Sequence, residues 1–189
     1  MKKFITIIIA LLTIQSASAW SRAIHAGIAA IADANLTEQT KEAISQALDG
    51  RNIVYSAQWM YDMEKTKGYE QTKNWRSVAV AKNNKPLNAK KSLNHKEDIV
   101  RRAQGLEALA AAIRAIEAGG LTKEQLADNI RYIVTIVGDL HCPTHYIYPE
   151  ALELRKMHYF YNDKKQSYTG YWEHSSIAGT FNWKTNEFV

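Results

Sequence analysis

Residues 138–145, Gly-Asp-Leu-His-Cys-Pro-Thr-His, place several potential metal ligands close together. Asp139, His141 and His145 offer a carboxylate and two imidazoles, which are common zinc ligands. The ring of Pro143 prevents the two histidines from lying on one regular helical face. An aspartate in an apolar helix is costly unless its charge is paired or coordinated. Two interpretations are open: a metal site, or a hydrogen-bonded network that holds no metal.

The first nineteen residues have the pattern of a secretory signal peptide. Lys2 and Lys3 precede an apolar stretch, residues 4–14, and the segment then ends in the small residues Ala17-Ser18-Ala19. An apolar stretch of eleven residues is too short to cross a bilayer, which takes about 20. We therefore predict that residues 1–19 are removed. The protein would be periplasmic or secreted, without stable membrane insertion.

Cleavage after Ala19 would give the mature chain a further metal-binding group. Trp20 would become the first residue, and its free α-amino nitrogen and carbonyl oxygen could bind a metal ion together with the imidazole of His25. Together with residues 138–145, this pattern suggests a metallohydrolase scaffold.

The remaining 189 − 19 = 170 residues are enough for one compact domain. The signal segment carries two lysines and no acids, so the net charge falls from +5 to +5 − 2 = +3. This mild excess permits a polyanionic partner but does not indicate one. The single cysteine, Cys142, cannot form an internal disulfide. It is either a buried, inert thiol or a zinc ligand.

The pattern of apolar residues is mainly helical. Thr37 has the position of an N-cap, and Thr122 with Gln125 has the spacing of a capping box. We expect helices over about 21–34, 37–48, 53–67, 96–118 and 122–141, an irregular segment over 76–93, and a β-hairpin with strands 158–161 and 166–172. The sequence predicts one mainly α domain, residues 20–189, with a short hairpin near its C-terminal end.

Three segments resemble a known family: Trp20-Ser21-Arg22-Ala23-Ile24-His25, the region of Trp59, and residues 138–145. They are similar to the zinc-dependent single-strand endonucleases of the S1/P1 type, which belong with the trinuclear-zinc phospholipases C. The resemblance extends from Trp20 to about Ile177. It implies a helical fold of the phospholipase C/nuclease type, hydrolysis of phosphodiesters, and single-stranded nucleic acid or nucleotides as partners.

The resemblance assigns ligands to individual zinc ions. Trp20, His25 and Asp139 fall on the ligands of one zinc, and Asp139 also bridges to a second, which makes it the candidate catalytic residue. His145 and Glu173 fall on ligands of a third zinc.

Other expected ligands are replaced. Tyr61, Arg76 and Thr135 stand where the second zinc would have an aspartate and two histidines, and Thr169 replaces a histidine of the third. Asp62 is a poor substitute, because one residue along a helix is a rotation of about 100°. The resemblance therefore implies one or two zinc ions rather than three, and reduced activity.

Arg76 has two interpretations. Its permanent positive charge could bind phosphate oxygens where the second ion would lie, or it could be a solvated surface arginine. Several aromatic side chains could likewise stack on bases or pack in the core; they are Tyr61, Trp75, Tyr146, Tyr168, Tyr171 and Trp172.

Three functions are therefore open. The first is an exported zinc-dependent phosphodiesterase with an incomplete metal centre. The second is a non-catalytic relative that binds phosphate, a nucleotide or a protein partner. The third is a helical scaffold without a small-molecule site. Relatives usually continue well beyond the position of Glu173, so we expect either an abbreviated domain or a truncated reading frame. The oligomeric state is open.

Overall fold

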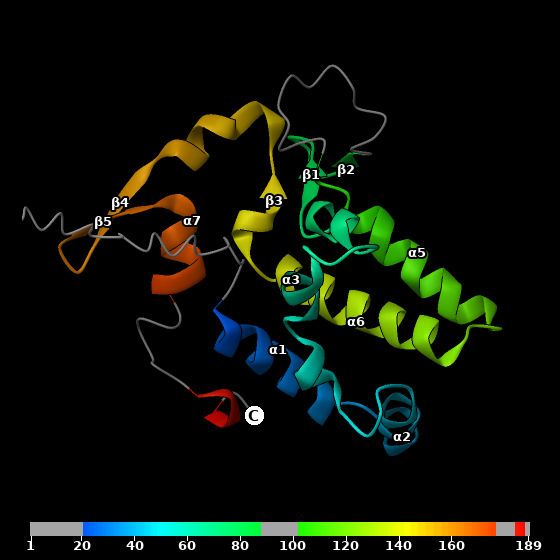
Figure 1. Ribbon diagram of the computed structural model, residues 1–189. Helices are drawn as coiled ribbons and strands as arrows, with labels where there is room; N and C mark the ends of the chain where they lie inside the picture. The colour runs from blue at the N-terminus through cyan, green and yellow to red at the C-terminus, as the bar shows by residue number, and fades with distance from the viewer. Residues whose placement is uncertain (1–20, 88–101, 177–183, 188–189) are drawn as a thin grey trace, which may run out of the picture.

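The computed structural model describes residues 21–87, 102–176 and 184–187. Its α-helices are α1 (Arg22–Ala34), α2 (Glu38–Ala47), α3 (Trp59–Met63), α5 (Gly105–Ala118), α6 (Lys123–Leu140) and α7 (Tyr168–Gly170). Short 3-10 segments are η1 (Ile53–Ser56), η2 (Glu70–Asn74), η3 (Pro143–His145), η4 (Pro149–Lys156) and η6 (Thr185–Glu187), and η5 (Tyr171–Ser175) is a π-helical turn. The strands are β1 (Val78–Val80), β2 (Pro86–Leu87), β3 (Tyr146–Ile147), β4 (His158–Tyr161) and β5 (Lys164–Ser167). The predicted mainly α fold with a C-terminal hairpin is confirmed (Figure 1).

Local capping explains where several helices begin. The side chain of Thr37 accepts a hydrogen bond from the backbone N–H of Thr40 at the start of α2. Thr122 and Gln125 form the predicted capping box at the start of α6. Each arrangement satisfies backbone donors that the first helical turn leaves unpaired.

Helix α6 is the element around which the other helices pack. It runs beside α5 and contacts α1, α2, α3 and η1 (Figure 1). Ile136 and Asp139, near its C-terminal end, are completely buried. Since α1 and α3 pack on this end, polar side chains from three helices meet there.

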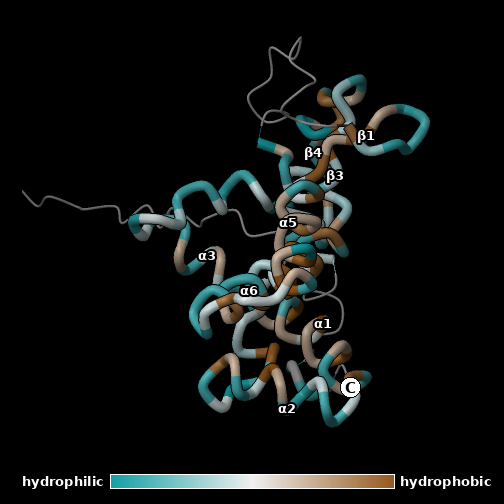
Figure 2. The backbone as a smooth tube through the Cα atoms, turned by 90° about the vertical axis from the view of Figure 1, so that its right-hand side faces the viewer, coloured by the Kyte–Doolittle hydropathy of each residue, from teal (hydrophilic) through white to brown (hydrophobic). Residues whose placement is uncertain are grey.

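A small three-stranded sheet brings the residues before β1 and β3 together. The strand order is β2-β1-β3, and β1 pairs in parallel with β3 so that Val78 lies opposite Tyr146. In a parallel pair with this register, the residues that precede the two strands also lie side by side. The hydrophobic stretches of β1 and β3 lie together in Figure 2, and Ala79 and Ile147 belong to the same buried cluster.

The hairpin formed by β4 and β5 packs one face against η5. The rings of Tyr159 and Tyr161 lie 5.9 and 5.6 Å from that of Tyr171. Asn162 and Asp163 form its two-residue turn with positive φ values of 50° and 59°, which such turns require. The hairpin thereby supports the segment that carries Glu173.

The predicted helix over 53–67 is wrong, because the chain forms two short helices, η1 and α3, in this region. A continuous helix would need the carbonyl of Ser56 for its own backbone. That carbonyl instead accepts a hydrogen bond of 3.3 Å from the buried hydroxyl of Thr135 on α6. The break between η1 and α3 thus coincides with a tertiary contact to α6.

Two other predicted boundaries are also wrong. The helix expected from residue 96 begins at Gly105. The backbone N–H groups at its start are used elsewhere, because Gln104 donates to the carbonyl of Asn74 and Gly105 to that of Ser77. Residues 88–101 lie outside the described part of the chain. The strand expected to reach Trp172 ends at Ser167, whose hydroxyl accepts from the N–H of Gly170 and so starts α7.

The segment 76–93, expected to be irregular, contains β1 and β2, which pair antiparallel. These strands are only three and two residues long, so a pattern of alternating side chains could not have shown them. Among the described helices, none is long and apolar enough to cross a membrane.

Candidate metal centre

His25 of α1 and Asp139 of α6 face each other inside the protein. The imidazole Nε2 lies 3.3 Å from the carboxylate Oδ1, and neither side chain is exposed to solvent. Within the described chain, both ring nitrogens of His25 and the Oδ2 atom of Asp139 lack hydrogen-bond partners. Buried polar atoms are normally satisfied, so this pair lacks the partners that burial demands.

Gly138 makes this close approach possible. A Cβ atom at this position would lie 2.9 Å from the Nδ1 atom of His25. Any other residue would therefore force the imidazole of His25 to move.

Tyr61 of α3 supplies the third group at this point. Its hydroxyl donates a hydrogen bond of 2.5 Å to Oδ1 of Asp139, the same oxygen that faces His25. The rings of His25 and Tyr61 meet edge to face at 5.6 Å. The phenol therefore occupies one side of the Asp139 carboxylate.

Arg76 lies over the ring of Tyr61. Its guanidinium carbon lies 4.1 Å from the centre of the Tyr61 ring, in a cation–π contact. Its Nη2 atom lies 3.1 Å from Oε2 of Glu64, and both side chains of this ion pair are largely buried, at 16% and 15% exposed. A desolvated cation–π contact contributes up to about 2 kcal/mol. Arg76 is thus fixed by two partners and is not a solvated surface arginine.

His145 lies beside Arg76, as the register of β1 and β3 requires. Its Nδ1 atom is hydrogen bonded to the backbone carbonyl of Arg76. Because a carbonyl can only accept, Nδ1 carries the proton and Nε2 keeps its lone pair. Burial lowers the pKa of His145 to about 4, so the imidazole is neutral near pH 7.

Glu173 is buried next to η3. The hydroxyl of Thr144 donates to its Oε1 atom at 3.4 Å, and its backbone carbonyl accepts from the N–H of Ser21 at 3.0 Å. Burial raises the pKa of Glu173 to about 7. The start of α1 is therefore tied to the segment that carries Glu173, while Trp20 lies outside the described residues.

Cys142 is fully buried, and its Sγ atom lies 3.2 Å from the hydroxyl of Thr144. Burial raises the pKa of this thiol to about 11. A thiolate is needed to bind zinc, so the contacts favour the inert thiol.

The sequence model of the S1/P1 Nuclease family matches residues 20–177 of this chain, which is more than half of its length. The chain belongs to the S1/P1 nuclease family. No curated protein showed a significant match to it.

Three of the positions at which the resemblance implies a replaced zinc ligand lie around Asp139. Tyr61 contacts the carboxylate directly, and Arg76 lies on Tyr61. Thr135 precedes Asp139 by one turn on α6, is fully buried, and bonds to the carbonyl of Ser56. The structure thus brings together the substituted positions that the resemblance assigned to one zinc.

Thr169 and His174 lie near Glu173 in the chain but differ from it in surroundings. The hydroxyl of Thr169 lies 3.2 Å from that of Ser167, and His174 is exposed. His174 therefore does not share the buried surroundings of Glu173.

Zinc is the metal that the S1/P1 family implies, and the pair of His25 and Asp139 fits part of a zinc site. Two ligands of a tetrahedral zinc ion lie about 3.3 Å apart, because bonds from zinc to nitrogen or oxygen are about 2.0–2.1 Å long. Nε2 and Oδ1 have this separation. Among residues 21–87, 102–176 and 184–187, no group of three or more His, Cys, Asp or Glu has the arrangement of a metal site. A complete site needs a further ligand, such as the predicted terminus at Trp20.

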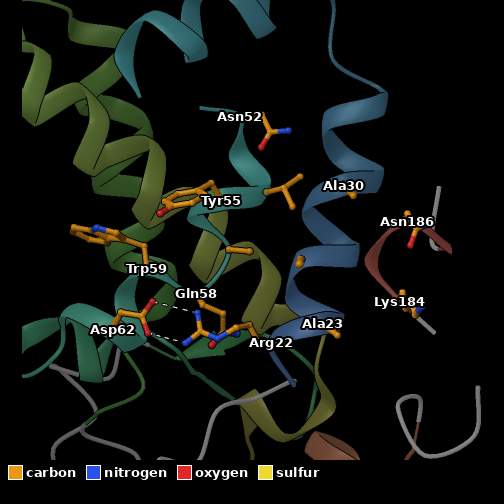
Figure 3. A pocket seen from close by; sticks show the side chains of 13 residues that line it. Arg22, Ala23, Ala30, Asn52, Tyr55, Gln58, Trp59, Asp62, Lys184 and Asn186 are labelled. Atoms are coloured by element: carbon orange, nitrogen blue, oxygen red, sulfur yellow. Dashed lines mark hydrogen bonds and ion pairs between the residues drawn. The ribbon is translucent and has the colours of Figure 1, made fainter. Parts of the chain in front are cut away.

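A separate open groove of about 1150 Å³ follows another face of α1. Arg22 and Asp62 pair across it with nitrogen–oxygen distances of 2.9 and 3.3 Å, and both side chains are mostly exposed (Figure 3). Neither His25 nor Asp139 lines this groove. Asp62 therefore faces away from Asp139, as its position one residue from Tyr61 predicts.

The shifted pKa values of Glu173 and His145 predict opposite effects of pH on the metal-free protein. Native Glu173 keeps its proton from about 4.5, its usual pKa, up to about 7, so its contribution to the free energy of unfolding falls as pH rises through this range. Native His145 remains unprotonated between about 4 and 6.5, where the unfolded state binds the extra proton, so its contribution rises with pH.

Replacing one of these two groups should therefore expose the contribution of the other. As the pH rises from 4.5 to 6.5, the unfolding free energy of Glu173→Gln should increase by about 2 kcal/mol relative to that of the wild type. Over the same rise, that of His145→Asn should decrease by about 2 kcal/mol relative to the wild type. Urea unfolding in the presence of a chelator measures both changes. Profiles that stay parallel to that of the wild type would contradict the assignment.

Glu64 is the residue of this centre that the sequence interpretation missed. It lies in the charged run Asp62-Met63-Glu64-Lys65, where nothing in the pattern separates a buried acid from a solvated one. Glu64 follows Tyr61 by three residues, a spacing that places both side chains on one side of a helix. This spacing is the one feature of the sequence that could have linked Glu64 to the centre.

Proposed function

We propose that this protein is an exported, zinc-dependent phosphodiester hydrolase of the S1/P1 type with reduced activity. One zinc ion would be held by the terminal amine and carbonyl of Trp20, by His25 and by Asp139. The observation that supports this most directly is the buried contact between His25 and Asp139, in which Nε2 and Oδ1 face each other at a ligand–ligand distance. Among the described residues, both ring nitrogens of His25 and the Oδ2 atom of Asp139 have no hydrogen-bond partner.

The chain's own groups account for both the activity and its limit. Bound zinc would polarise the phosphate and lower the pKa of a bound water. Asp139 and His25 hold that position and exclude solvent, since both are completely buried. Tyr61 donates to the carboxylate of Asp139 and Arg76 lies over the ring of Tyr61, where the resemblance would place ligands of a second ion. The paired-metal clamp on the attacking and leaving oxygens would therefore be missing.

A second zinc ion would use His145 and Glu173. His145 is neutral and presents Nε2, as a ligand must. Glu173, with a pKa of about 7, would have to lose its proton, so occupancy of this position should increase with pH. We therefore propose one or two zinc ions rather than three.

Binding of phosphate or nucleotides without turnover is the second candidate function. It is favoured by Nη1 of Arg76, which is buried without a hydrogen-bond partner among the described residues and offers a donor to a phosphate oxygen. Incubation of zinc-loaded protein with a labelled single-stranded DNA separates the candidates. Cleavage that a chelator abolishes supports the hydrolase, and retention of the intact strand supports the binding protein.

The proposal predicts the composition of the processed protein. We expect protein exported with its own leader to begin at Trp20 and to contain at least one zinc ion per chain. An additional residue before Trp20 should displace the terminal amine and weaken zinc binding by about 10-fold or more, because a ligand is lost. N-terminal sequencing and elemental analysis measure these properties. Equal zinc affinity with and without the extension would exclude the amino-terminal ligand.

A further inference from the structure

Tyr61, Arg76 and Glu64 form a continuous chain of contacts that ends on Asp139. The carboxylate of Glu64 pairs with Arg76, the guanidinium of Arg76 lies over the ring of Tyr61, and the hydroxyl of Tyr61 donates to Asp139. We infer that these three residues position Asp139 for a single metal ion, in place of the second cation that the family's ligands would hold. This inference rests on the proposed zinc site.

The hydrogen bond from Tyr61 can fix the orientation of the carboxylate. It reaches Oδ1, the atom that faces His25, while Oδ2 has no hydrogen-bond partner among the described residues. A carboxylate ligand that accepts such a bond cannot rotate freely. Outer partners of this kind commonly orient metal ligands.

Arg76 and Glu64 hold Tyr61 in turn. A cation over an aromatic ring withdraws electron density and makes the phenol a stronger donor, so the position of Arg76 at 4.1 Å strengthens the bond to Asp139. The buried Glu64 keeps the guanidinium in this position. The backbone of Arg76 also contacts His145, so one residue links both halves of the candidate centre.

The test is the affinity of the metal-free protein for zinc, measured in competition with a chromophoric chelator. Tyr61→Phe keeps the ring and removes the hydroxyl, and it should weaken zinc binding by about 10- to 100-fold. Glu64→Gln leaves Tyr61 intact and releases Arg76, and it should weaken binding by a smaller factor, about 3- to 10-fold.

Asp62→Asn is the matched control. It makes the same change from a carboxylate to an amide, next to Tyr61, in an arginine pair that is exposed and faces the groove. Zinc affinity should stay within about 2-fold of the wild type, as expected for an exposed pair. The thermal midpoints of the metal-free variants identify any variant whose weaker binding reflects a loss of folding; Glu64→Gln decides the matter if Tyr61→Phe is unstable.

The outcomes separate this inference from the proposed function. Weaker binding by Tyr61→Phe and Glu64→Gln, with Asp62→Asn unchanged, supports the positioning role. Wild-type binding with equal or tighter binding by Tyr61→Phe overturns the positioning role alone. A wild-type protein that binds no zinc overturns the proposed function together with this inference.

Discussion

Replacing Asp139 with asparagine is expected to abolish measurable zinc binding at the main site. The change keeps the size of the side chain but removes the charge, and its amide nitrogen cannot act as the carboxylate oxygen does. Losing a ligand costs more than losing an outer hydrogen bond, so we expect an affinity loss greater than about 100-fold. Isothermal titration of the metal-free protein with zinc measures it.

A second aspartate of α6, Asp128, provides the control for Asp139→Asn. Asp128, on the same helix, carries a carboxylate that accepts hydrogen bonds from Tyr69 and Arg131, away from His25. Asp128→Asn should leave zinc affinity unchanged. Zinc binding by Asp139→Asn that matches the wild type would mean that the pair of His25 and Asp139 is a structural contact.

Restoring the family's ligands should have the largest effect on activity. The triple variant Tyr61→Asp, Arg76→His, Thr135→His removes the phenol that bonds to Asp139 and the cation above its ring. It adds a carboxylate and two imidazoles at the positions where the resemblance implies the ligands of the second zinc. A paired-metal site provides several kcal/mol of transition-state stabilisation, so we expect the rate of phosphodiester hydrolysis to rise by about 100-fold or more. Hydrolysis of single-stranded DNA at saturating zinc measures it.

A second triple variant separates ligand restoration from the loss of the original contacts. Tyr61→Phe, Arg76→Met, Thr135→Val removes the same polar groups without adding ligands, and it should not gain activity. Because Thr135 is completely buried, a histidine there risks overpacking. Thermal unfolding shows whether the variant is folded. A folded variant that binds an additional zinc ion without faster hydrolysis would show that ligand loss does not limit activity.

Local sequence signals predicted much of the helical framework. Thr37 and the pair of Thr122 and Gln125 mark the starts of α2 and α6 because capping depends on residues within one turn. The same signals failed at Ser56, where the helix breaks and the carbonyl bonds to Thr135 on a distant helix. They also failed at Gln104, where the backbone joins the edge of β1.

The sequence by itself determined which chemical groups are available, since residue type and spacing are written in the chain, and it led to His25, Asp139, His145 and Glu173 as candidate ligands. The fold buries all four of them. Only the tertiary structure decided what surrounds them. His25 and Asp139 are more than a hundred positions apart, and they meet where α1 packs on α6 and Gly138 leaves room for the imidazole. The contact of Tyr61 with Asp139 comes from the packing of α3 on α6, and the register of β1 with β3 places His145 beside Arg76. Both depend on contacts between distant segments, which no local pattern records.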